Sequence, residues 1–245
     1  MEQKVVLVTG ASSGLGRAMA VRFRREGFMV IGVCRHCPEE TVVERWIEAD
    51  LTTAAGRDRV VEVLSREVGR LDVLINNAGK GNYATWEELT EEELRALFEL
   101  DFFAPVLLTG KLLPLLEQSG GTIINIASVA GKMHVPCMGA YCAGKAAMIL
   151  YSDSLRPELV RRGIRVLCVL PGRIDTGFSS RAFGRRQPPE TPGGGRAEVL
   201  AERVITAYRR GRRRLFYPGW YRLALLIPKL LPGLYDRKNI ELWHL

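Results

Sequence analysis

A tyrosine and a lysine stand four residues apart in segment 140–147, which reads AYCAGKAA. On a helix this spacing places the side chains of Tyr141 and Lys145 on one face, about one turn apart. An ammonium group beside a phenol favours the phenolate, so we expect Lys145 to lower the pKa of Tyr141 from about 10 toward neutrality. Such a pair is suited to exchanging a proton with the oxygen of an alcohol or a ketone.

A third polar side chain follows a predicted buried strand. The apolar segment 121–127 is typical of such a strand, and Ser128 comes directly after it, where a loop should begin. Its hydroxyl can donate a hydrogen bond to the same substrate oxygen. A tyrosine and a lysine alone would more often belong to an ordinary surface helix. Ser128 and the glycine segment near the N-terminus reverse that expectation.

The glycine segment lies between a predicted strand, 4–9, and a predicted helix, 15–25, and reads TGASSGLG over residues 9–16. A strand, a glycine turn and a helix form the place where a dinucleotide pyrophosphate binds, because the helix N-terminus offers free N–H groups to an anion. The residues predicted to bind there are Gly10, Ser12, Ser13, Gly14, Leu15 and Gly16.

These motifs resemble those of the short-chain dehydrogenase/reductase family, in the branch with TGxxxGxG and YxxxK. Further matches, in the family's order over residues 4 to 180, are Asp50 and Leu51, the NNAG run at 76–79, and Pro171 and Gly172 with Thr176. The resemblance implies an α/β fold of the Rossmann type: a doubly wound parallel sheet of about seven strands with helices on both faces, in one domain over 1–245. It also implies reversible hydride transfer between a nicotinamide and a carbonyl or secondary alcohol.

By the same resemblance, a second set of residues borders the cofactor: Asp50, Leu51, Asn77, Ala78, Gly79, Tyr141, Lys145, Pro171, Gly172, Ile174 and Thr176. The choice of cofactor depends on the end of the predicted strand 28–34. An acidic side chain there would bind the ribose hydroxyls of NAD, whereas a cation would bind the extra phosphate of NADP. The chain has Cys34 and then Arg35. We therefore expect NADP(H) rather than NAD(H), with Arg35 on the 2′-phosphate; otherwise Arg35 is an exposed loop residue.

Asp101 stands where most members of that family have an asparagine. By the resemblance, this position helps to hold a water in a proton relay to the lysine, so Asp101 joins Ser128, Tyr141 and Lys145 as a predicted catalytic residue. Its charge should raise the pKa of Lys145 and strengthen the charged form. We expect the relay to survive. The alternative, which only Asp101 favours, is an NADP(H)-binding regulator or sensor with little catalysis.

The predicted substrate contacts are Ser128, His134, Tyr141 and Phe178. The apolar loop 129–139 should face the substrate. His134 in this loop could be a second acid/base group, but we expect it to be a pocket wall or a surface residue. Segment 178–196, rich in Gly, Pro and Arg, is predicted to be a mobile lid, with a disordered insertion as the alternative. The NNAGxG run and the YPG stretch at 217–219 resemble the branch of 17β-hydroxysteroid, retinol and keto-lipid reductases, which favours a lipophilic ketone or aldehyde over sugars or polyols.

The C-terminal extension, 212–245, combines basic, aromatic and apolar residues. Its apolar run, 223–231, is interrupted by Pro228 and Lys229 and is shorter than the about 20 residues that span a bilayer. It suits either a short helix in peripheral contact with a membrane or a wall of the substrate site. The formal net charge is +8. No nucleic-acid-binding module accompanies this charge, so a solvated face, cofactor phosphates or anionic lipid explains it better.

The five cysteines include a CxxC pair, Cys34 and Cys37. Because no second pair has ligand spacing, we expect free thiols in a reducing compartment rather than a zinc or redox site. The N-terminus lacks a signal-peptide pattern, so we expect a cytoplasmic protein. The resemblance places a dimer interface on the predicted catalytic helix, 140–162, and the helix before it. It therefore implies a homodimer or homotetramer.

Overall fold

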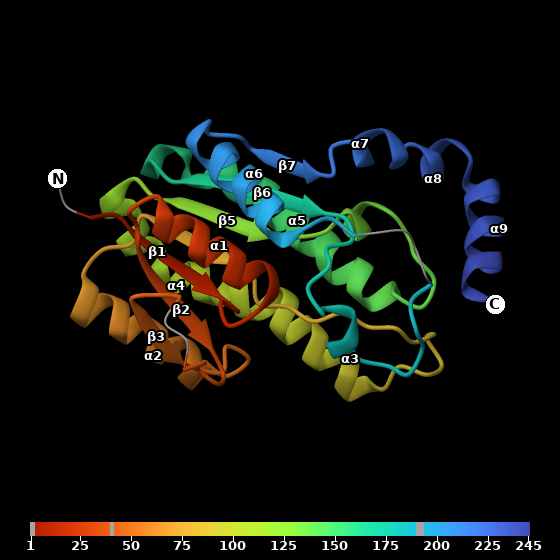
Figure 1. Cartoon of the computed structure of the whole chain (residues 1–245), viewed down its shortest axis with the longest axis horizontal. Coiled ribbons are helices and arrows are strands. Elements are labelled where there is room, and N and C mark those ends of the chain that lie inside the picture. The colour runs from red at the N-terminus through yellow and green to blue at the C-terminus, as the bar shows by residue number, and fades with distance from the viewer. Residues whose placement is uncertain (1–2, 40–41, 190–193) are drawn as a thin grey trace.

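The computed structural model describes residues 3–39, 42–189 and 194–245 and is built on a seven-stranded parallel sheet (Figure 1). The strands lie in the order β3-β2-β1-β4-β5-β6-β7. Their bounds are β1 Val5–Thr9, β2 Met29–Cys34, β3 Arg45–Glu48, β4 Val73–Asn76, β5 Thr122–Ile126, β6 Arg165–Pro171 and β7 Arg214–Tyr217. Every residue of β1, β4 and β5 is buried, as expected where both faces of a parallel sheet are covered.

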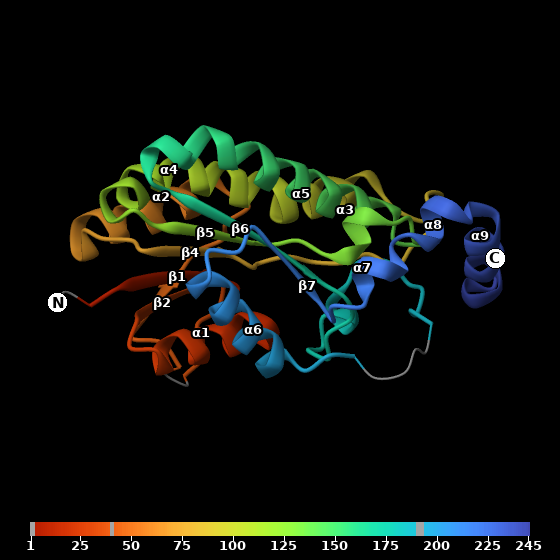
Figure 2. The same ribbon diagram turned by 90° about the horizontal axis from the view of Figure 1, so that it is seen from above.

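Helices cover both faces of the sheet (Figure 2). On one face lie α1 (Gly14–Arg25) and α6 (Ala197–Arg209); on the other lie α2 (Ala54–Val63), α4 (Ala104–Ser119) and α5 (Gly139–Leu159), with α3 (Glu91–Phe98) packed against α5. The apolar side of each helix faces the sheet: Phe23 of α1 and Leu200 of α6 in one core, Leu108 of α4 and Leu155 of α5 in the other. The predicted doubly wound fold is confirmed.

The strand order reverses at β1, which pairs with β2 on one side and β4 on the other. In a doubly wound sheet, the crevice at such a reversal, beyond the carboxyl ends of the strands, is where ligands bind. The predicted glycine turn, the NNAG run and Ser128 each follow one of these carboxyl ends. The topology therefore brings the glycine turn after β1, the NNAG run after β4 and Ser128 after β5 to one edge of the sheet.

Local signals set several helix ends as predicted. Thr90 and Glu93 form a capping box at the start of α3, with Thr90 Oγ1 accepting the N–H of Glu93 at 3.2 Å. Thr53 caps α2 by accepting the N–H of Gly56 at 3.0 Å. The predicted helix 54–68 is α2 extended by a π-helical turn, Leu64–Val68, which ends at Gly69 with φ at 69°.

A second π-helical turn, Glu99–Phe103, joins α3 to α4 and contains the buried Asp101. With α3 and α4 this turn forms one continuous helical stretch that widens at Asp101. Single π-helical turns are frequent at functional sites, because the extra residue re-aims one side chain. Here the re-aimed group is a carboxylate.

The tail forms three short helices, α7 (Tyr221–Ala224), α8 (Ile227–Leu230) and α9 (Pro232–Trp243), not the single helix predicted over 223–231. Pro228 and Pro232 explain the breaks, because proline favours the first turn of a helix and cannot continue a preceding one. The tail extends beyond the sheet at one end of the molecule (Figure 1). Short 3-10 turns complete the described elements at Val129–Lys132, Val160–Arg162 and Ser179–Arg181. None of the helices in the described ranges has the length and apolar character needed to cross a bilayer.

Candidate active site

The carboxyl ends of the central strands open into a cavity of about 710 Å³. Its lining contains every predicted site residue except Asp101 and His134: Gly10, Ser12, Ser13, Gly14, Leu15, Gly16, Arg35, Asp50, Leu51, Asn77, Ala78, Gly79, Ser128, Tyr141, Lys145, Pro171, Gly172, Ile174, Thr176 and Phe178. Residues separated by more than 160 positions thus share one cavity. Their roles there stay predictions, but their proximity is a property of the fold.

Three polar groups meet at the centre of this cavity. Tyr141 and Lys145 lie on the same face of α5, and Ser128 caps the turn that follows β5. The Lys145 Nζ atom lies 5.5 Å from the centre of the Tyr141 ring. The Ser128 hydroxyl accepts the N–H of Ala130 at 3.1 Å and donates to the carbonyl of Pro171 at 3.3 Å. All three side chains are buried, which makes their charges strongly interdependent.

Asp101 lies behind Lys145, away from the cavity. Its Oδ2 is 2.9 Å from Lys145 Nζ, while its Oδ1 accepts the backbone N–H of Lys80 at 2.7 Å. Burial on its own lowers the pKa of Lys145, but the charge of Asp101 and the phenol of Tyr141 outweigh burial, so the pKa is raised. The expectation that Asp101 strengthens the charged form of Lys145 therefore agrees with the structure.

The pKa of Tyr141, however, lies above its usual value. Burial is the largest cause and the charge of Asp101 adds to it; the Lys145 ammonium and the hydrogen bond with Ser128 act in the opposite direction but are weaker. This corrects the expectation that Lys145 brings the pKa toward neutrality. At neutral pH Tyr141 is a protonated phenol beside an ammonium group, which is a proton donor with its counter-charge already in place.

The end of the cavity at β1 fits a dinucleotide phosphate. Gly10 and Gly14 have φ values of 66° and 54°, which favour glycine, and a Cβ on Gly16 would lie 2.1 Å from the carbonyl oxygen of Gly10. Ser13 is the N-cap of α1, yet its hydroxyl makes no capping hydrogen bond. The helix start therefore offers N–H groups and a hydroxyl to an anion that can approach the backbone closely.

Arg35 and Asp50 line the cavity after β2 and β3. The Asp50 carboxylate accepts hydrogen bonds from the hydroxyl of Thr52 at 2.7 Å and from its N–H at 3.0 Å. Burial alone would raise the pKa of Asp50; these bonds and the charge of Arg35 outweigh it and lower the pKa. The cation of Arg35 thus acts at the end of the cavity where the resemblance places the adenosine of the cofactor.

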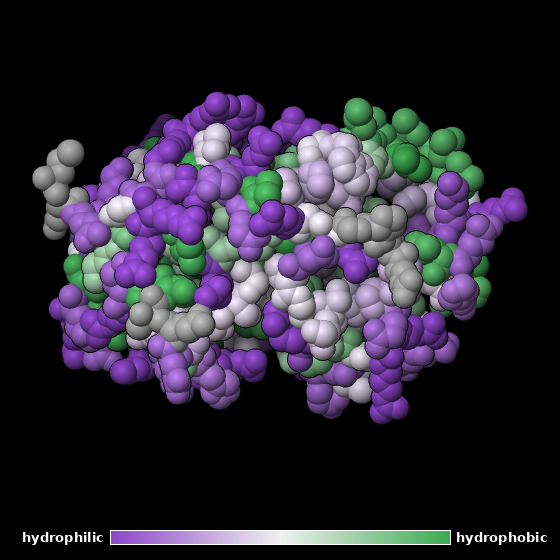
Figure 3. Space-filling view, viewed as in Figure 1, coloured by the Kyte–Doolittle hydropathy of each residue, from purple (hydrophilic) through white to green (hydrophobic). Residues whose placement is uncertain are grey.

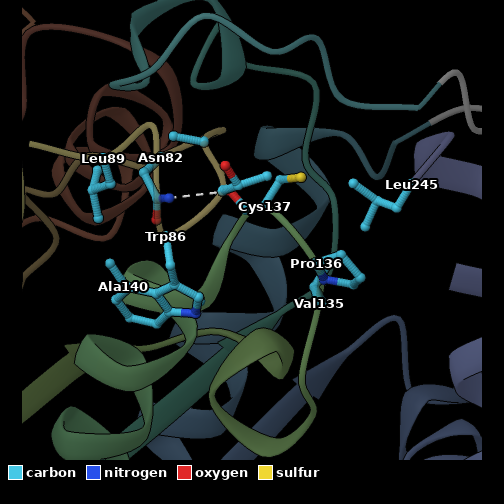
Figure 4. Close-up of a pocket in the computed structure, with 11 residues that line it drawn as sticks. Asn82, Trp86, Leu89, Val135, Pro136, Cys137, Ala140 and Leu245 are labelled. Atoms are coloured by element: carbon cyan, nitrogen blue, oxygen red, sulfur yellow. Dashed lines mark hydrogen bonds between the residues drawn. The ribbon is translucent and has the colours of Figure 1, made fainter. Parts of the chain in front are cut away.

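A smaller pocket of about 210 Å³ lies beside the start of α5, and Figure 4 shows Asn82 pointing at the loop that borders it. The Nδ2 of Asn82 donates to the carbonyl of Cys137 at 3.1 Å, and its Oδ1 accepts the N–H of Tyr141 at 2.9 Å. This fully buried amide ties the first turn of α5 to the loop 133–138. We did not predict it, because its only signal was an asparagine directly after the NNAGKG run.

His134 lies outside the large cavity, contrary to its predicted contact with substrate. Its side chain is 58% exposed, and its Nε2 lies 2.7 Å from Asp236 Oδ1 on α9. The hydroxyl of Tyr235 also donates to the His134 carbonyl at 2.8 Å, so this loop residue anchors the tail. We predicted that the tail is either a wall of the substrate site or a membrane contact. It does supply walls of the cavity: Tyr221, Tyr235, Asn239, Leu242 and Trp243.

The predicted lid, 178–196, borders the cavity from the other side. Phe178 lies 5.8 Å from Tyr141 between ring centres, and Pro188 and Pro189 also line the cavity. The N–H of Tyr83 donates to the Phe183 carbonyl at 2.8 Å, which fixes the middle of the segment. Residues 190–193 lie outside the described residues, so mobility of the lid stays a prediction.

Comparisons with known proteins agree with this geometry. The family model for short chain dehydrogenase matches residues 4–186. A 3-ketodihydrosphingosine reductase of Bacteroides thetaiotaomicron is 38% identical over 180 residues, 73% of this chain and 67% of that protein. An NADPH-dependent 3-dehydrocapnine reductase of Ornithobacterium rhinotracheale is 36% identical over 199 residues, 76% of this chain and 70% of that protein. The structure of a short-chain dehydrogenase from Sphingobium yanoikuyae in complex with NADPH superposes with a TM-score of 0.78 at 30% identity, covering 95% of this chain and 96% of that one.

Proposed function

The chain belongs to the short-chain dehydrogenase family and is an oxidoreductase of CH–OH and keto groups, and on that premise we propose that it reduces lipophilic ketones or aldehydes with NADPH. The proposal rests mainly on one observation. A single cavity is lined by Ser128, Tyr141 and Lys145 and, at one end, by the glycine turn after β1. The proposed proton donor and the proposed phosphate site therefore line the same cavity.

In this mechanism the chain handles the substrate oxygen. Ser128 donates a hydrogen bond to the carbonyl, and Tyr141 gives its proton to the oxygen as negative charge develops there. Lys145, held in its charged form by Asp101, stabilises the phenolate that remains. The bound nicotinamide supplies the hydride. Because its pKa is raised, Tyr141 stays protonated near neutral pH and can give this proton to a carbonyl oxygen.

NADP(H) is proposed over NAD(H) because of Arg35. Arginine binds phosphate through two parallel N–H donors, and the residue before it, Cys34, is not the acidic group that would hold the free ribose hydroxyls. A relative that is named NADPH-dependent and a similar structure in complex with NADPH support this choice.

A lipophilic substrate is proposed because the cavity around Tyr141 is largely apolar. The walls there include Leu100, Met133, Val135, Met138, Leu242 and Trp243. Apolar walls of this kind gain binding energy from hydrocarbon, whereas they leave the hydroxyls of a sugar without hydrogen-bond partners. Two relatives are named for the reduction of 3-ketodihydrosphingosine and 3-dehydrocapnine, so long-chain ketones are the first class to test.

The test is NADPH oxidation by the purified protein on paired panels. Long-chain ketones, 3-ketodihydrosphingosine among them, form one panel; aldoses and polyol-derived ketones of few carbons form the other. We expect turnover on the first panel and little on the second. Turnover on the polar panel alone would overturn the substrate class, whereas tight NADPH binding without turnover on either would favour a sensor.

We further propose that the tail meets an anionic lipid surface. Figure 3 shows an apolar patch over α7 and α8, where Leu223 and Leu230 are both 72% exposed. Arg222 and Lys229 lie next to them in the chain, and basic side chains beside an apolar face are typical of helices that lie in a membrane interface. Because the same tail lines the cavity, a lipid substrate could pass from membrane to site.

Sedimentation with vesicles tests this contact. We expect binding to anionic vesicles, weaker binding to zwitterionic ones, and loss of both in the Leu223→Glu/Leu230→Glu variant. Val199→Glu, at an exposed apolar position on α6, is the matched control and should bind like the unaltered protein. Equal sedimentation of both variants would contradict the contact; concentration-dependent self-association through the tail would indicate a second copy of the chain instead.

A further inference from the structure

The Cys34–Cys37 pair flanks the residue that is proposed to select the cofactor. Cys34 ends β2, Arg35 follows it, and Cys37 stands two residues further on. The Cys34 thiol donates to the Cys37 sulfur, with the two Sγ atoms 3.5 Å apart. Cys34 and Arg35 both line the large cavity. The thiol pair therefore lies at the cofactor end of the site, outside the catalytic centre.

The surroundings of the pair do not suit a metal. Structural zinc takes four ligands, and in the ranges that the structure describes no group of three or more His, Cys, Asp or Glu side chains gathers. Both cysteines are free thiols in the structure. Two thiols in contact without further ligands are suited to one other reaction, the reversible formation of a disulfide.

We propose that Cys34 and Cys37 form a reversible disulfide that weakens NADP(H) binding at Arg35. An S–S bond is about 2.05 Å long, so its formation must draw Cys37 toward Cys34 from their present separation. The backbone of Arg35 and His36 is then closed into a small ring. Binding a phosphate through two parallel N–H donors requires a definite orientation of the guanidinium, and closing this ring changes the backbone that sets that orientation. This step rests on the proposed contact between Arg35 and the 2′-phosphate.

The accessibility of the two thiols sets the order of the chemistry. Cys37 is partly exposed, whereas Cys34 is buried, and burial followed by the hydrogen bond to Cys37 raises the pKa of Cys34 to about 12. A peroxide therefore reacts first at Cys37: its sulfur takes one oxygen of hydrogen peroxide, the O–O bond breaks, and water leaves. The Cys34 sulfur then displaces the hydroxyl of the Cys37 sulfenic acid as a second water. Two thiols lose two electrons and two protons, and the peroxide accepts them.

The remaining cysteines provide an internal reference. Cys137, Cys142 and Cys168 are all buried, and burial raises the pKa of Cys142 and of Cys168 to about 11 each. Buried thiols with raised pKa values react slowly with peroxide. Oxidation under mild conditions should therefore be confined to the Cys34–Cys37 peptide.

In the experiment, the full chain is treated with hydrogen peroxide and the peroxide is then removed. Two readouts follow: the masses of its peptides without reduction, and the Kd values for NADPH and NADH from fluorescence titrations. We expect the Cys34–Cys37 peptide to lose two hydrogens and the Kd for NADPH to rise by about tenfold or more, with the Kd for NADH changing less than about twofold. Dithiothreitol should restore both readouts. NADPH bound before treatment should slow the mass change, because it covers this end of the cavity.

Cys37→Ser is the control variant, since it keeps the size of a partly exposed side chain and removes the disulfide. It should bind NADPH as tightly as the reduced protein does, and peroxide treatment should leave its Kd for NADPH unchanged. Two free thiols after treatment, or a disulfide with an unchanged Kd for NADPH, would overturn the inference. If the reduced protein bound NADPH no more tightly than NADH, the proposed cofactor choice would be wrong. The proposed effect of the disulfide on NADP(H) binding would then be wrong too, while the peptide masses would still show whether the disulfide forms.

Discussion

Tyr141, Lys145 and Asp101 form a buried row of three titratable side chains, and in the proposed mechanism their mutual charges set the pH range of proton transfer. Asp101 raises the pKa of Lys145, and its charge also adds to the rise at Tyr141. In carbonyl reduction the donor is the protonated phenol, so activity is present below the pKa of Tyr141 and is lost as pH rises through it. In the proposed mechanism, an aspartate at this position therefore extends reduction toward higher pH.

Asp101→Asn tests that relation. The amide keeps an oxygen that can accept the N–H of Lys80 but removes the negative charge. Loss of the charge lowers the pKa of Tyr141, so the alkaline limb of the kcat profile for ketone reduction should move to lower pH. The profile is measured at saturating NADPH and ketone. A limb that stays in place, or moves to higher pH, would show that Asp101 does not act through the Tyr141 charge.

The spacing of single residues predicted which side chains lie together, but not the direction in which their pKa values shift. A Tyr and a Lys four positions apart on a helix must share a face, and the structure has them so. Whether the phenol gains or loses acidity depends on burial by Phe178 and other distant segments, which spacing does not contain. Asn82 was missed for a similar reason, because its two hydrogen bonds join segments far apart in the chain.

The elements that end at the cavity determine how the cofactor is held. The turn after β1 requires glycine at Gly16, and the end of β2 presents Arg35 to the proposed 2′-phosphate. Gly16 and Arg35 can each be substituted alone. The effect of close backbone approach can therefore be measured separately from the effect of the Arg35 charge.

Gly16→Ala should lower the free energy of unfolding by about 1–3 kcal/mol, because the added Cβ would meet the backbone carbonyl of Gly10 in a tightly packed turn. Gly110→Ala is the control: Gly110 is exposed on α4 with nothing within 4 Å of an added Cβ, so alanine should raise stability by about 0.5–1 kcal/mol. Urea unfolding of both variants measures these changes. A stable Gly16→Ala protein with normal NADPH affinity would contradict the close packing of this turn.

Arg35→Asp should weaken NADPH binding by about 100-fold, since it replaces a phosphate-binding cation with an anion, and should change NADH binding by less than about threefold. Titration of both cofactors into the variant and the unaltered protein gives the comparison. Equal losses for NADPH and NADH would contradict the assignment of Arg35.

The sequence predicted the strands and the capped helices well, because their signals are local. Buried parallel strands are continuous apolar runs, and the Thr90–Glu93 box marks a helix start regardless of its surroundings. The tail was predicted less well. Its three helices take their positions from contacts such as Tyr235 with the His134 carbonyl, which connect segments that a local pattern treats separately.

Helices α4 and α5, which lie on the same face of the sheet, each expose a leucine. Leu107 on α4 and Leu150 on α5, the latter 68% exposed, lie on the two helices where the family resemblance puts a dimer interface. Isolated exposed leucines are common, but two on the proposed interface helices support a homodimer or homotetramer.

If the chain forms the oligomer that the resemblance implies, Leu150→Arg should convert it to a monomer, because an unpaired charge would be buried in the interface. Light scattering after size-exclusion chromatography measures the mass, and circular dichroism checks that the variant is folded. The equivalent change at exposed Val199 on α6 should leave the mass unaltered. A monomeric unaltered protein, or a Leu150→Arg variant that keeps the mass of the oligomer, would contradict this interface.

The most direct measurement of the central claim follows the hydride itself. NADPH deuterated at C4 of the nicotinamide is mixed with a long-chain ketone and the protein, and the alcohol product is analysed by mass spectrometry. We predict that deuterium appears on the carbinol carbon with the unaltered protein, and that Tyr141→Phe binds NADPH normally but forms product at least about 1,000-fold more slowly. Tight NADPH binding with no labelled alcohol from any ketone, or undiminished transfer in Tyr141→Phe, would contradict the proposed reductase mechanism.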